Sequence, residues 1–234
     1  MIYGGILAGG MGTRMQSGGI PKQLICVGGV PVLIRTLKAF LGCHCFDGVL
    51  IAMNAVWRDY AERLINESGV AKGVVKIIEG GATRFESLIN LSREIRRLDS
   101  DAVLVNHDCA RPFVSRRILE DCISQIEDFD MVTTSIPTID TVLVSADGKK
   151  SDGVPERSTI FLDQGPQVFR VNQFLDLVDS LTVEEKTKYM EAGRLYLDKG
   201  LSVGIVKGER TNFKLTTPFD LVVAEAMIKK GLVS

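Results

Sequence analysis

The chain begins MIYGGILAGGMGTRMQSGGIPKQL at residues 1–24, a hydrophobic run followed by a glycine-rich turn. Residues 2–7 have the composition of a short buried strand, and glycines follow at positions 9, 10 and 12. Because glycine has no Cβ, such a turn brings backbone N–H groups close to an anion. Arg14 and Lys22 come next and could neutralise a triphosphate. The stretch predicts a strand that leads into a phosphate-binding loop.

Two familiar phosphate motifs do not describe this loop. A Walker loop closes with Gly-Lys-Ser/Thr, which is missing here, and the dinucleotide fingerprint needs a glycine where Met15 stands. The alternative interpretation is a plain glycine-rich turn with solvated basic residues. The presence of both Arg14 and Lys22 favours phosphate binding.

The composition is that of an ordinary globular protein. The 234 residues suffice for one large domain with a substantial core, and we expect a single domain over 1–234. Hydrophobic residues make up 45% and charged residues 24%. The net charge of -1 argues against nucleic acid or a membrane surface as partner. The sequence also lacks an apolar run of membrane-spanning length and a signal-peptide pattern at its start.

The cysteines are odd in number and lack the spacing of a disulfide framework. We therefore expect the protein to reside in the reducing cytoplasm with all its cysteines as free thiols. They are Cys26, Cys43, Cys45, Cys109 and Cys122. Cys43-His44-Cys45 resembles half of a metal site, but no second pair stands at zinc-ligand spacing. A loop at the end of a helix is the preferred interpretation.

Strand and helix patterns alternate along the chain. Continuous apolar runs predict strands at 2–7, 49–53, 74–78, 102–105, 131–136 and 202–206. Periodicity and capping residues predict helices near 31–42, 54–64, 83–95, 115–126, 171–181, 182–199 and 217–231. Such an order is typical of an α/β fold, with a Rossmann-like, mostly parallel sheet covered by helices on both faces.

The alternation stops between residues 137 and 165. Strand-like runs at 138–144 and 158–162 flank the turn Asp147-Gly148-Lys149. We interpret this segment as a protruding β-arm. A long excursion without a core of its own is usually functional or part of an interface.

Ligands of open α/β sheets bind beyond the carboxyl ends of the strands, and Asp108 stands at one such end. Magnesium is usually held by one or two carboxylates together with phosphate oxygens. Asp108 is therefore a candidate Mg²⁺ ligand, and the alternative is a structural salt bridge with Arg111. We expect neighbouring His107 to be a packing residue rather than an acid.

Seven motifs occur in order along nearly the whole chain. They are LAGGxGTRM at 7–15, PKQ at 21–23, GGxxRxxS at 80–87, HDxxRP at 107–112, DT at 140–141, QxPQxF at 164–169 and NxKxT at 212–216. Together they resemble the cytidylyltransferases that activate polyol phosphates. That group includes the ribitol-5-phosphate and the methylerythritol-phosphate enzymes. The resemblance implies a fold of the nucleotide-diphospho-sugar transferase type.

The resemblance assigns roles to matching positions on the CTP side. Catalytic roles would fall to Arg14, Lys22, Asp108 and Lys214, with Lys214 at the α-phosphate. CTP would contact Leu7, Ala8, Gly9, Gly10, Gly12, Thr13, Gly81, Ala82, Arg84 and Ser87, the last four around the cytosine. Mg²⁺ would be the cofactor, bound by Asp108 with Asn212 as a second ligand.

On the acceptor side, the resemblance implies that Arg111, Thr141 and Arg157 bind the polyol phosphate. Thr141 and Arg157 lie on the predicted arm and would reach the neighbouring subunit, which suggests a homodimer with shared sites. The acceptor phosphate would attack the α-phosphorus of CTP in line, and pyrophosphate would leave. Phosphate oxygens are ionised at neutral pH, so this reaction needs no general base.

Two positions depart from the family pattern on the acceptor side. Gly165 stands where the family usually has threonine, and Met190-Glu191 replaces a Thr-Asp pair. The start Leu-Ala-Gly-Gly and Arg111-Pro112-Phe113 favour ribitol 5-phosphate as acceptor, with methylerythritol phosphate as the alternative. A third hypothesis is a nucleotide-binding protein of the same fold that has lost turnover, although intact Lys22, Asp108 and Lys214 argue against it.

Overall fold

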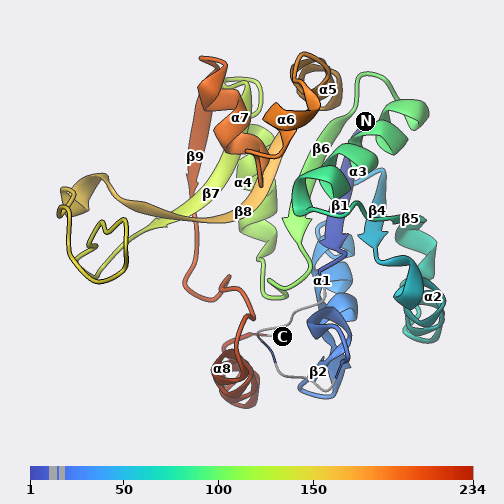
Figure 1. Ribbon diagram of the computed structural model, residues 1–234. Coiled ribbons are helices and arrows are strands. Elements are labelled where there is room, and N and C mark those ends of the chain that lie inside the picture. The colour runs from blue at the N-terminus through green and yellow to red at the C-terminus, as the bar shows by residue number, and fades with distance from the viewer. Residues whose placement is uncertain (11–14, 16–18, 234) are drawn as a thin grey trace.

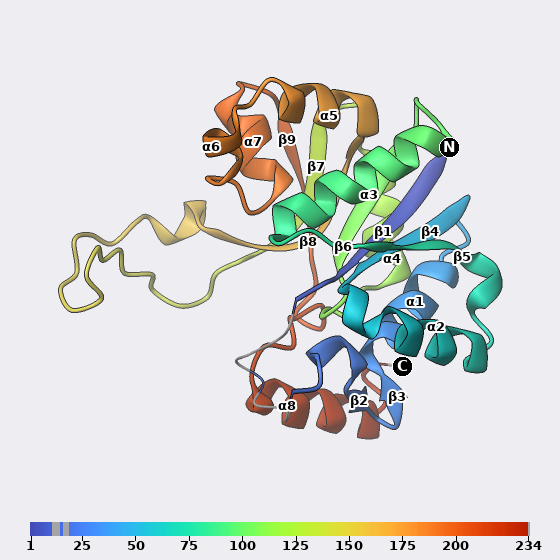
Figure 2. The same ribbon diagram turned by 45° about the vertical axis from the view of Figure 1, so that its right-hand side comes forward.

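The computed structural model describes residues 1–10, 15 and 19–233, which build a central sheet between layers of helices (Figures 1 and 2). Within these residues a seven-stranded sheet runs in the order β5-β4-β1-β6-β8-β7-β9. Its strands are β1 (Ile2–Ala8), β4 (Gly48–Met53), β5 (Val74–Glu79), β6 (Val103–Asp108), β7 (Met131–Pro137), β8 (Phe161–Arg170) and β9 (Val203–Lys207). A small hairpin joins β2 (Cys26–Val27) to β3 (Val30–Pro31).

The sheet is mostly parallel, as predicted. Strand β1 pairs in parallel with β4 and β6, β4 pairs in parallel with β5, and β7 pairs in parallel with β9. Strand β8 runs antiparallel to both of its neighbours, β6 and β7. The carboxyl ends of β1, β4, β5 and β6 therefore meet at one edge of the sheet.

Helices cover both faces of the sheet and bury two separate apolar cores (Figure 2). Side chains of α1, α2 and α4 contribute to one core, and those of α3, α5 and α7 to the other. The helices are α1 (Val32–Leu41), α2 (Arg58–Glu67), α3 (Arg84–Leu98), α4 (Arg116–Ser124), α5 (Val171–Asp179), α6 (Val183–Lys186), α7 (Ala192–Asp198) and α8 (Pro218–Lys229).

Strand β4 shows why the buried strands have continuous apolar sequences. Val49, Ile51 and Met53 point into one core, while Leu50 and Ala52 point into the other. Successive side chains of a strand face opposite sides of the sheet. A strand covered on both faces therefore needs an apolar residue at every position.

The predicted arm protrudes from the body, but its predicted strands are largely wrong. Residues 138–160, which we call the arm, leave the sheet between β7 and β8 (Figures 1 and 2). The arm holds an isolated bridge between Val144 and Gly153 and one short 3₁₀ turn, Arg157–Thr159. The predicted turn at Gly148 is present, with φ of 70°. A two-stranded ribbon without a covering layer is marginally stable, so β-favouring residues alone do not form strands here.

Two further elements differ from the expected pattern. Residues 161–165, expected to be part of the arm, belong to the long strand β8. The single helix expected over 182–199 is two helices, α6 and α7. Its predicted start is confirmed, because Thr182 and Glu185 form a capping box. The second helix starts separately because the Glu191 carboxylate accepts hydrogen bonds from the N–H groups of its first turn.

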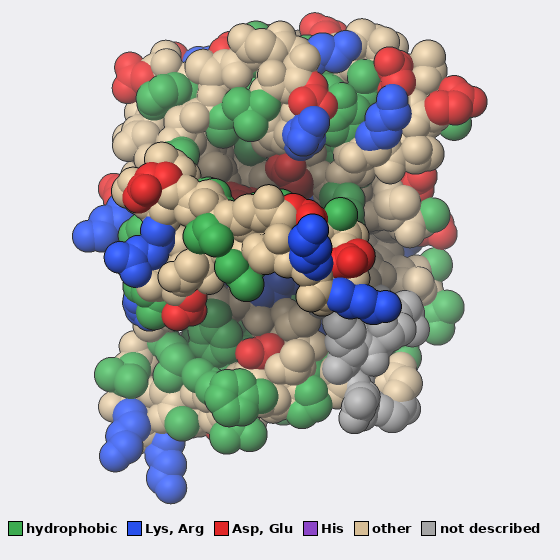
Figure 3. Space-filling model, turned by 60° about the vertical axis from the view of Figure 1, so that its left-hand side comes forward, with side chains coloured by type: hydrophobic (Ala, Val, Ile, Leu, Met, Phe, Trp, Pro, Cys, Tyr) green, Lys and Arg blue, Asp and Glu red, His purple; other side chains and the backbone are tan. Residues whose placement is uncertain are grey.

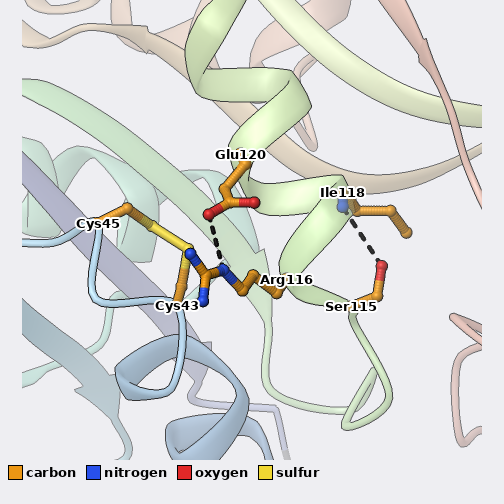
Figure 4. Close-up of a disulfide and its surroundings, with 6 residues drawn as sticks. All are labelled: Cys43, Cys45, Ser115, Arg116, Ile118 and Glu120. Carbon is orange, nitrogen blue, oxygen red and sulfur yellow. Dashed lines mark hydrogen bonds and ion pairs between the residues drawn. A yellow bond between two sulfur atoms is a disulfide. The ribbon is translucent and has the colours of Figure 1, made fainter.

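The expectation of five free thiols is wrong at the end of α1. Cys43 and Cys45 form a disulfide beside the first turn of α4, as Figure 4 shows. His44 between them has a positive φ of 58°, and the two Cα atoms lie 5.3 Å apart, within the range that a disulfide bridges. The loop itself was predicted. The cytoplasmic location was argued from free thiols and stays a prediction. No helix in the described part of the chain is both long and apolar enough to cross a bilayer.

Candidate active site

A pocket opens at the predicted edge of the sheet, beyond the carboxyl ends of β1, β5 and β6. The end of β1, the loop before α3, the end of β6 and the segment before α8 each contribute side chains or backbone to it. Its described lining, which we call the nucleotide pocket, is Leu7, Ala8, Gly9, Gly10, Lys22, Gln23, Gly81, Ala82, Thr83, Arg84, Ser87, Asp108, Cys109, Ala110 and Lys214. Figure 3 shows that the arm crosses this side of the molecule and that the surface is hollowed on both sides of it.

Most residues assigned to CTP binding or catalysis come together in this one pocket. Lys22, Asp108 and Lys214 lie in its wall, together with the CTP-side residues Leu7, Ala8, Gly9, Gly10, Gly81, Ala82, Arg84 and Ser87. Gly12, Thr13 and Arg14 lie outside the described residues. The remaining assignments, Arg111, Thr141, Arg157 and Asn212, do not line it.

Gln23 organises the loop after β1, a role that sequence reasoning missed. Its side chain is buried, and Nε2 donates to the carbonyl oxygens of Ala8 and Gly10, the latter at 2.8 Å. Next to it, Lys22 Nζ donates to the carbonyl oxygen of Leu215 at 2.9 Å, which links the loop to the Lys214 segment. The signal was present in the motif Pro21-Lys22-Gln23. A buried amide that binds two backbone carbonyls fixes a loop that has few side chains of its own.

The loop before α3 is held by its own side chains. Ser87 Oγ accepts from Gly81 N at 3.0 Å and donates to the carbonyl oxygen of Thr83 at 2.9 Å. Thr83 caps the predicted helix, because its hydroxyl accepts from Glu86 N at 3.1 Å. The Glu86 carboxylate in turn accepts from Ala82 N at 2.8 Å. A Cβ on Gly81 would collide with the Cβ of Glu86, so no larger residue fits this loop. The loop presents a rigid strip of backbone to the pocket.

A carboxylate between two cations forms the charged centre of the pocket. Arg84 Nε lies 2.9 Å from Asp108 Oδ1, and Lys214 Nζ lies 2.5 Å from Oδ2. Burial alone would raise the pKa of Asp108, but the charges of Arg84 and Lys214 outweigh burial and hold that pKa well below its usual range. The proposed alternative of a salt bridge is thus present, with Arg84 and Lys214 in place of Arg111.

The residues on either side of Asp108, at the end of β6, are buried and uncharged. Burial lowers the pKa of His107 to about 4, and its Nε2 lies 3.0 Å from the carbonyl oxygen of Arg111. Its ring packs on Phe40, so the predicted packing role is confirmed. Burial also raises the pKa of Cys109 to about 12. The thiol lines the nucleotide pocket but is 1% exposed, which removes it as a nucleophile.

A second, smaller pocket adjoins the first on the side of β8. Its lining is polar: Arg84, Asn106, His107, Asp108, Arg111, Asp163, Gln164, Gly165 and Gln167. We call it the polar pocket. Arg111 is anchored to backbone there, since its guanidinium donates to the carbonyl oxygens of Asn212 and Asp163 at 2.9 and 3.3 Å.

Asn106 and Gln167 line the polar pocket, but the sequence analysis did not identify them as site residues. Gln167 is nevertheless part of the motif QxPQxF at 164–169. Within the described residues, the Asn106 amide and Gln167 Oε1 are buried without a hydrogen-bond partner. Asn212 contacts a residue of this pocket, because its fully buried side chain donates to the carbonyl oxygen of Gly165 at 2.9 Å. That position gives Asn212 no contact with the nucleotide pocket, where a metal ligand was expected.

The two arm residues lie away from both pockets. Thr141 and Arg157 are exposed, and the Arg157 guanidinium donates only to the carbonyl oxygen of Ile139, at 3.4 Å, among the described contacts. The arm that contains both residues protrudes from the body of the protein (Figure 1).

Asp108 is the one carboxylate lining the described part of the nucleotide pocket, and the described residues contain no group of three His, Cys, Asp or Glu side chains that could hold a metal ion. A single carboxylate fits a magnesium ion that is held mainly by the phosphates of a nucleotide. It does not fit a metal cage built by the protein alone.

A model of the family IspD, 2-C-methyl-D-erythritol 4-phosphate cytidylyltransferase, matches residues 4–230. The chain belongs to this family. It is therefore a nucleotidyltransferase enzyme of the CTP-dependent cytidylyltransferase type.

Solved structures agree with the IspD assignment. The 4-diphosphocytidyl-2C-methyl-D-erythritol synthase of Anaerococcus prevotii is 24% identical, with a TM-score of 0.80 over 98% of this chain and 96% of that one. The 2-C-methyl-D-erythritol 4-phosphate cytidylyltransferase of Thermus thermophilus is 28% identical, with a TM-score of 0.73 over 98% and 100%. That of Francisella tularensis is 26% identical, with a TM-score of 0.78 over 96% and 98%.

The IspD match supports the alternative acceptor, methylerythritol phosphate, better than the preferred one. The enzymes that act on either acceptor belong to the polyol-phosphate cytidylyltransferases. The resemblance to that group, which the motifs indicated, is confirmed. The preference for ribitol 5-phosphate rested on short stretches near Leu7 and Arg111, and the family match gives it no support.

Proposed function

We propose that this enzyme transfers CMP from CTP to 2-C-methyl-D-erythritol 4-phosphate and releases pyrophosphate. One observation carries the proposal: in a chain of the IspD family, Lys22, Arg84, Asp108 and Lys214 converge on one pocket at the strand ends. A reaction between two polyanions needs such a concentration of positive charge.

CTP occupies the nucleotide pocket in this proposal. The triphosphate lies against the loop after β1 and near Lys22, and the base lies against the loop before α3. Ser87 and Glu86 already engage the N–H groups of Gly81 and Ala82. The carbonyl oxygens of that loop are then the groups that accept from the exocyclic amine of cytosine. Uracil has a carbonyl at that position and cannot donate.

The chemistry follows from charge and position. An oxygen of the acceptor phosphate forms a bond to the α-phosphorus of CTP, and the bond from that phosphorus to the β-phosphate oxygen breaks. Lys22 and Lys214 stabilise the charge that develops on the phosphate oxygens. Asp108 would hold Mg²⁺, which supplies charge neutralisation along the triphosphate.

The acceptor approaches from the polar pocket, and its site is completed by a second subunit. Thr141 and Arg157 on the arm of one chain bind the phosphate of the acceptor that sits in the pocket of the neighbouring chain. The enzyme is therefore a homodimer in this proposal. Exposed apolar side chains on the arm support this proposal: Ile139, Leu143 and Val154 are 59–63% exposed. A protruding segment with such side chains is typical of an interface.

Pyrophosphate release with CTP, Mg²⁺ and a panel of polyol phosphates tests the activity and the acceptor together. We expect 2-C-methyl-D-erythritol 4-phosphate to give the highest kcat/KM. A higher kcat/KM with ribitol 5-phosphate would reverse the choice of acceptor. No release with any acceptor, despite CTP binding, would leave the non-catalytic binding protein as the answer.

A further inference from the structure

Arg84 and Asp108 stand where the two pockets meet. They are the residues shared by the described linings of the nucleotide pocket and the polar pocket. In an in-line transfer the acceptor phosphate and the α-phosphate of CTP must come within bonding distance. The wall between the two pockets is therefore where the reacting groups meet, and Arg84 is part of that wall.

Arg84 has hydrogen-bond donors left over for a ligand. It is the first residue of α3; Nε donates to Asp108 and Nη1 donates to the carbonyl oxygen of Met190 at 3.1 Å. A guanidinium has five N–H donors, and the contacts of the described residues use two of them. Its side chain is 27% exposed, so solvent and ligands reach it.

The departure of Arg84 would not leave Asp108 as a lone buried charge. Lys214 Nζ stays on the other carboxylate oxygen, at 2.5 Å. Removing one partner from a buried ion pair is costly when it strands the other charge, and this arrangement avoids that cost. Arg111, the other cation of the polar pocket, donates to two backbone carbonyls and does not line the nucleotide pocket, so it does not lie between the two reacting groups. Arg84 is thus the cation in this wall best placed to exchange a carboxylate for a phosphate.

We propose that Arg84 binds the phosphomonoester group of the acceptor, exchanging the Asp108 carboxylate for phosphate oxygens. This deepens the proposed function and rests on it. The role differs from the position beside cytosine that the family resemblance implied for this residue. Because Nη1 also binds the loop that carries Met190, the same contact ties acceptor binding to the segment between α6 and α7.

Variants at this position separate acceptor binding from nucleotide binding. In Arg84→Met we expect the KM for the acceptor, 2-C-methyl-D-erythritol 4-phosphate, to rise about ten- to hundredfold, the effect of losing a charge-assisted contact. The KM for CTP should change less than about threefold. Arg84→Lys should restore part of the loss, since it keeps the charge but not the planar fork. Arg97→Met on the same helix, at an exposed ion pair with Glu94, is the matched control.

Titration calorimetry with 2-C-methyl-D-erythritol 4-phosphate and CTP as separate ligands makes the test independent of turnover. Weaker acceptor binding in Arg84→Met, with CTP binding intact, supports the inference. Unchanged acceptor binding, or a loss of CTP binding alone, overturns it. A drop in kcat with both affinities unchanged also overturns it, because that result assigns Arg84 to holding Asp108. Wild-type protein that binds acceptor through Arg84 but releases no pyrophosphate would refute the proposed function and leave this inference standing.

Discussion

The centre of the site depends on a single carboxylate whose charge is fixed by its neighbours. Asp108 is ionised at any working pH because Arg84 and Lys214 depress its pKa strongly. Such a group suits an electrostatic role, as a ligand of Mg²⁺ or an anchor of cations, and not proton transfer. Its function can be tested by removing the charge while keeping the shape.

We expect Asp108→Asn to fold normally and to lower kcat/KM by about two orders of magnitude or more. The amide keeps the size of the side chain but loses the charge that pairs with two cations and would bind Mg²⁺. Steady-state kinetics at saturating Mg²⁺ and circular dichroism measure the two effects. Asp179→Asn, at an exposed ion pair with Arg93, is the control. Near wild-type turnover of Asp108→Asn would remove the carboxylate from the mechanism.

His107 makes stability depend on pH in a known direction. Burial lowers its pKa from 6.5 to about 4 in the folded protein. Between these values the unfolded chain binds a proton that the folded chain does not, so stability rises with pH. From pH 5 to 6.5 the gain is on the order of 2 kcal/mol in the free energy of unfolding.

Urea unfolding at several pH values measures this slope. In His107→Gln, which does not titrate, the slope between pH 5 and 6.5 should be smaller. Asp108 does not interfere, because the stability that its lowered pKa contributes is lost only as the pH falls through the ordinary aspartate pKa of 3.8 and below, outside this window. An equal slope in both proteins would show that the pKa of His107 is the same in the folded and the unfolded chain, which contradicts this prediction.

At the scale of elements, the start of α3 fixes the loop that we propose to bind the base of CTP. Ser87 and Ser92 both donate to the carbonyl four residues earlier, at 2.9 Å. Ser87 alone also accepts from Gly81 N and so positions the loop. These two serines form a matched pair for a test of base choice.

Ser87→Ala should reduce the preference for CTP over UTP by about tenfold, because the backbone of Gly81 loses its fixed position. Ser92→Ala removes the same kind of helix contact and should leave the preference unchanged. The ratio of kcat/KM values for CTP and UTP is the measurement. Equal use of the two nucleotides by the wild type would already refute recognition through this loop.

The elements that could be predicted from sequence are those whose pattern is local. Residues 49–53 are apolar throughout because both faces of β4 are buried, and Thr217 with Pro218 starts α8 because capping is a contact over one turn. The interruption between α6 and α7 was not predicted. Glu191 caps α7 only because the chain before it leaves the helical conformation, and the local sequence pattern does not show this. The arm was predicted as strands because β-favouring residues carry no information on whether a partner strand is present.

The site could be predicted as a set of residues but not as a set of contacts. The motifs brought Lys22, Asp108 and Lys214 to the correct sheet edge, since the carboxyl ends of parallel strands meet there. Which cations pair with Asp108 depends on distances between β6, α3 and the segment before α8. The disulfide of Cys43 and Cys45 depends in the same way on the backbone of His44. Spacing along the sequence does not contain such distances.

At the scale of the whole molecule, apolar side chains are exposed both on the arm, where a second subunit is proposed to bind, and on α8. Hydrophobic side chains gather below the arm in Figure 3, at the end of the molecule that carries α8. Phe219 and Val222 of α8 are 72% and 66% exposed. Together with the exposed apolar residues of the arm, this surface is consistent with a second copy that covers it.

A mixture of two inactive variants decides whether the sites are shared between subunits. Lys22→Ala breaks the nucleotide pocket, and Arg157→Ala breaks the proposed contact of the arm with the acceptor phosphate. If the arm serves the neighbouring chain, a mixed dimer holds one site with both defects and one with neither. Random exchange of equal amounts makes half of the dimers mixed, so about a quarter of the wild-type sites should return. If each chain completes its own site, every site stays broken. Failure to recover activity in a verified mixed dimer would therefore refute the shared site, even for a protein that is dimeric.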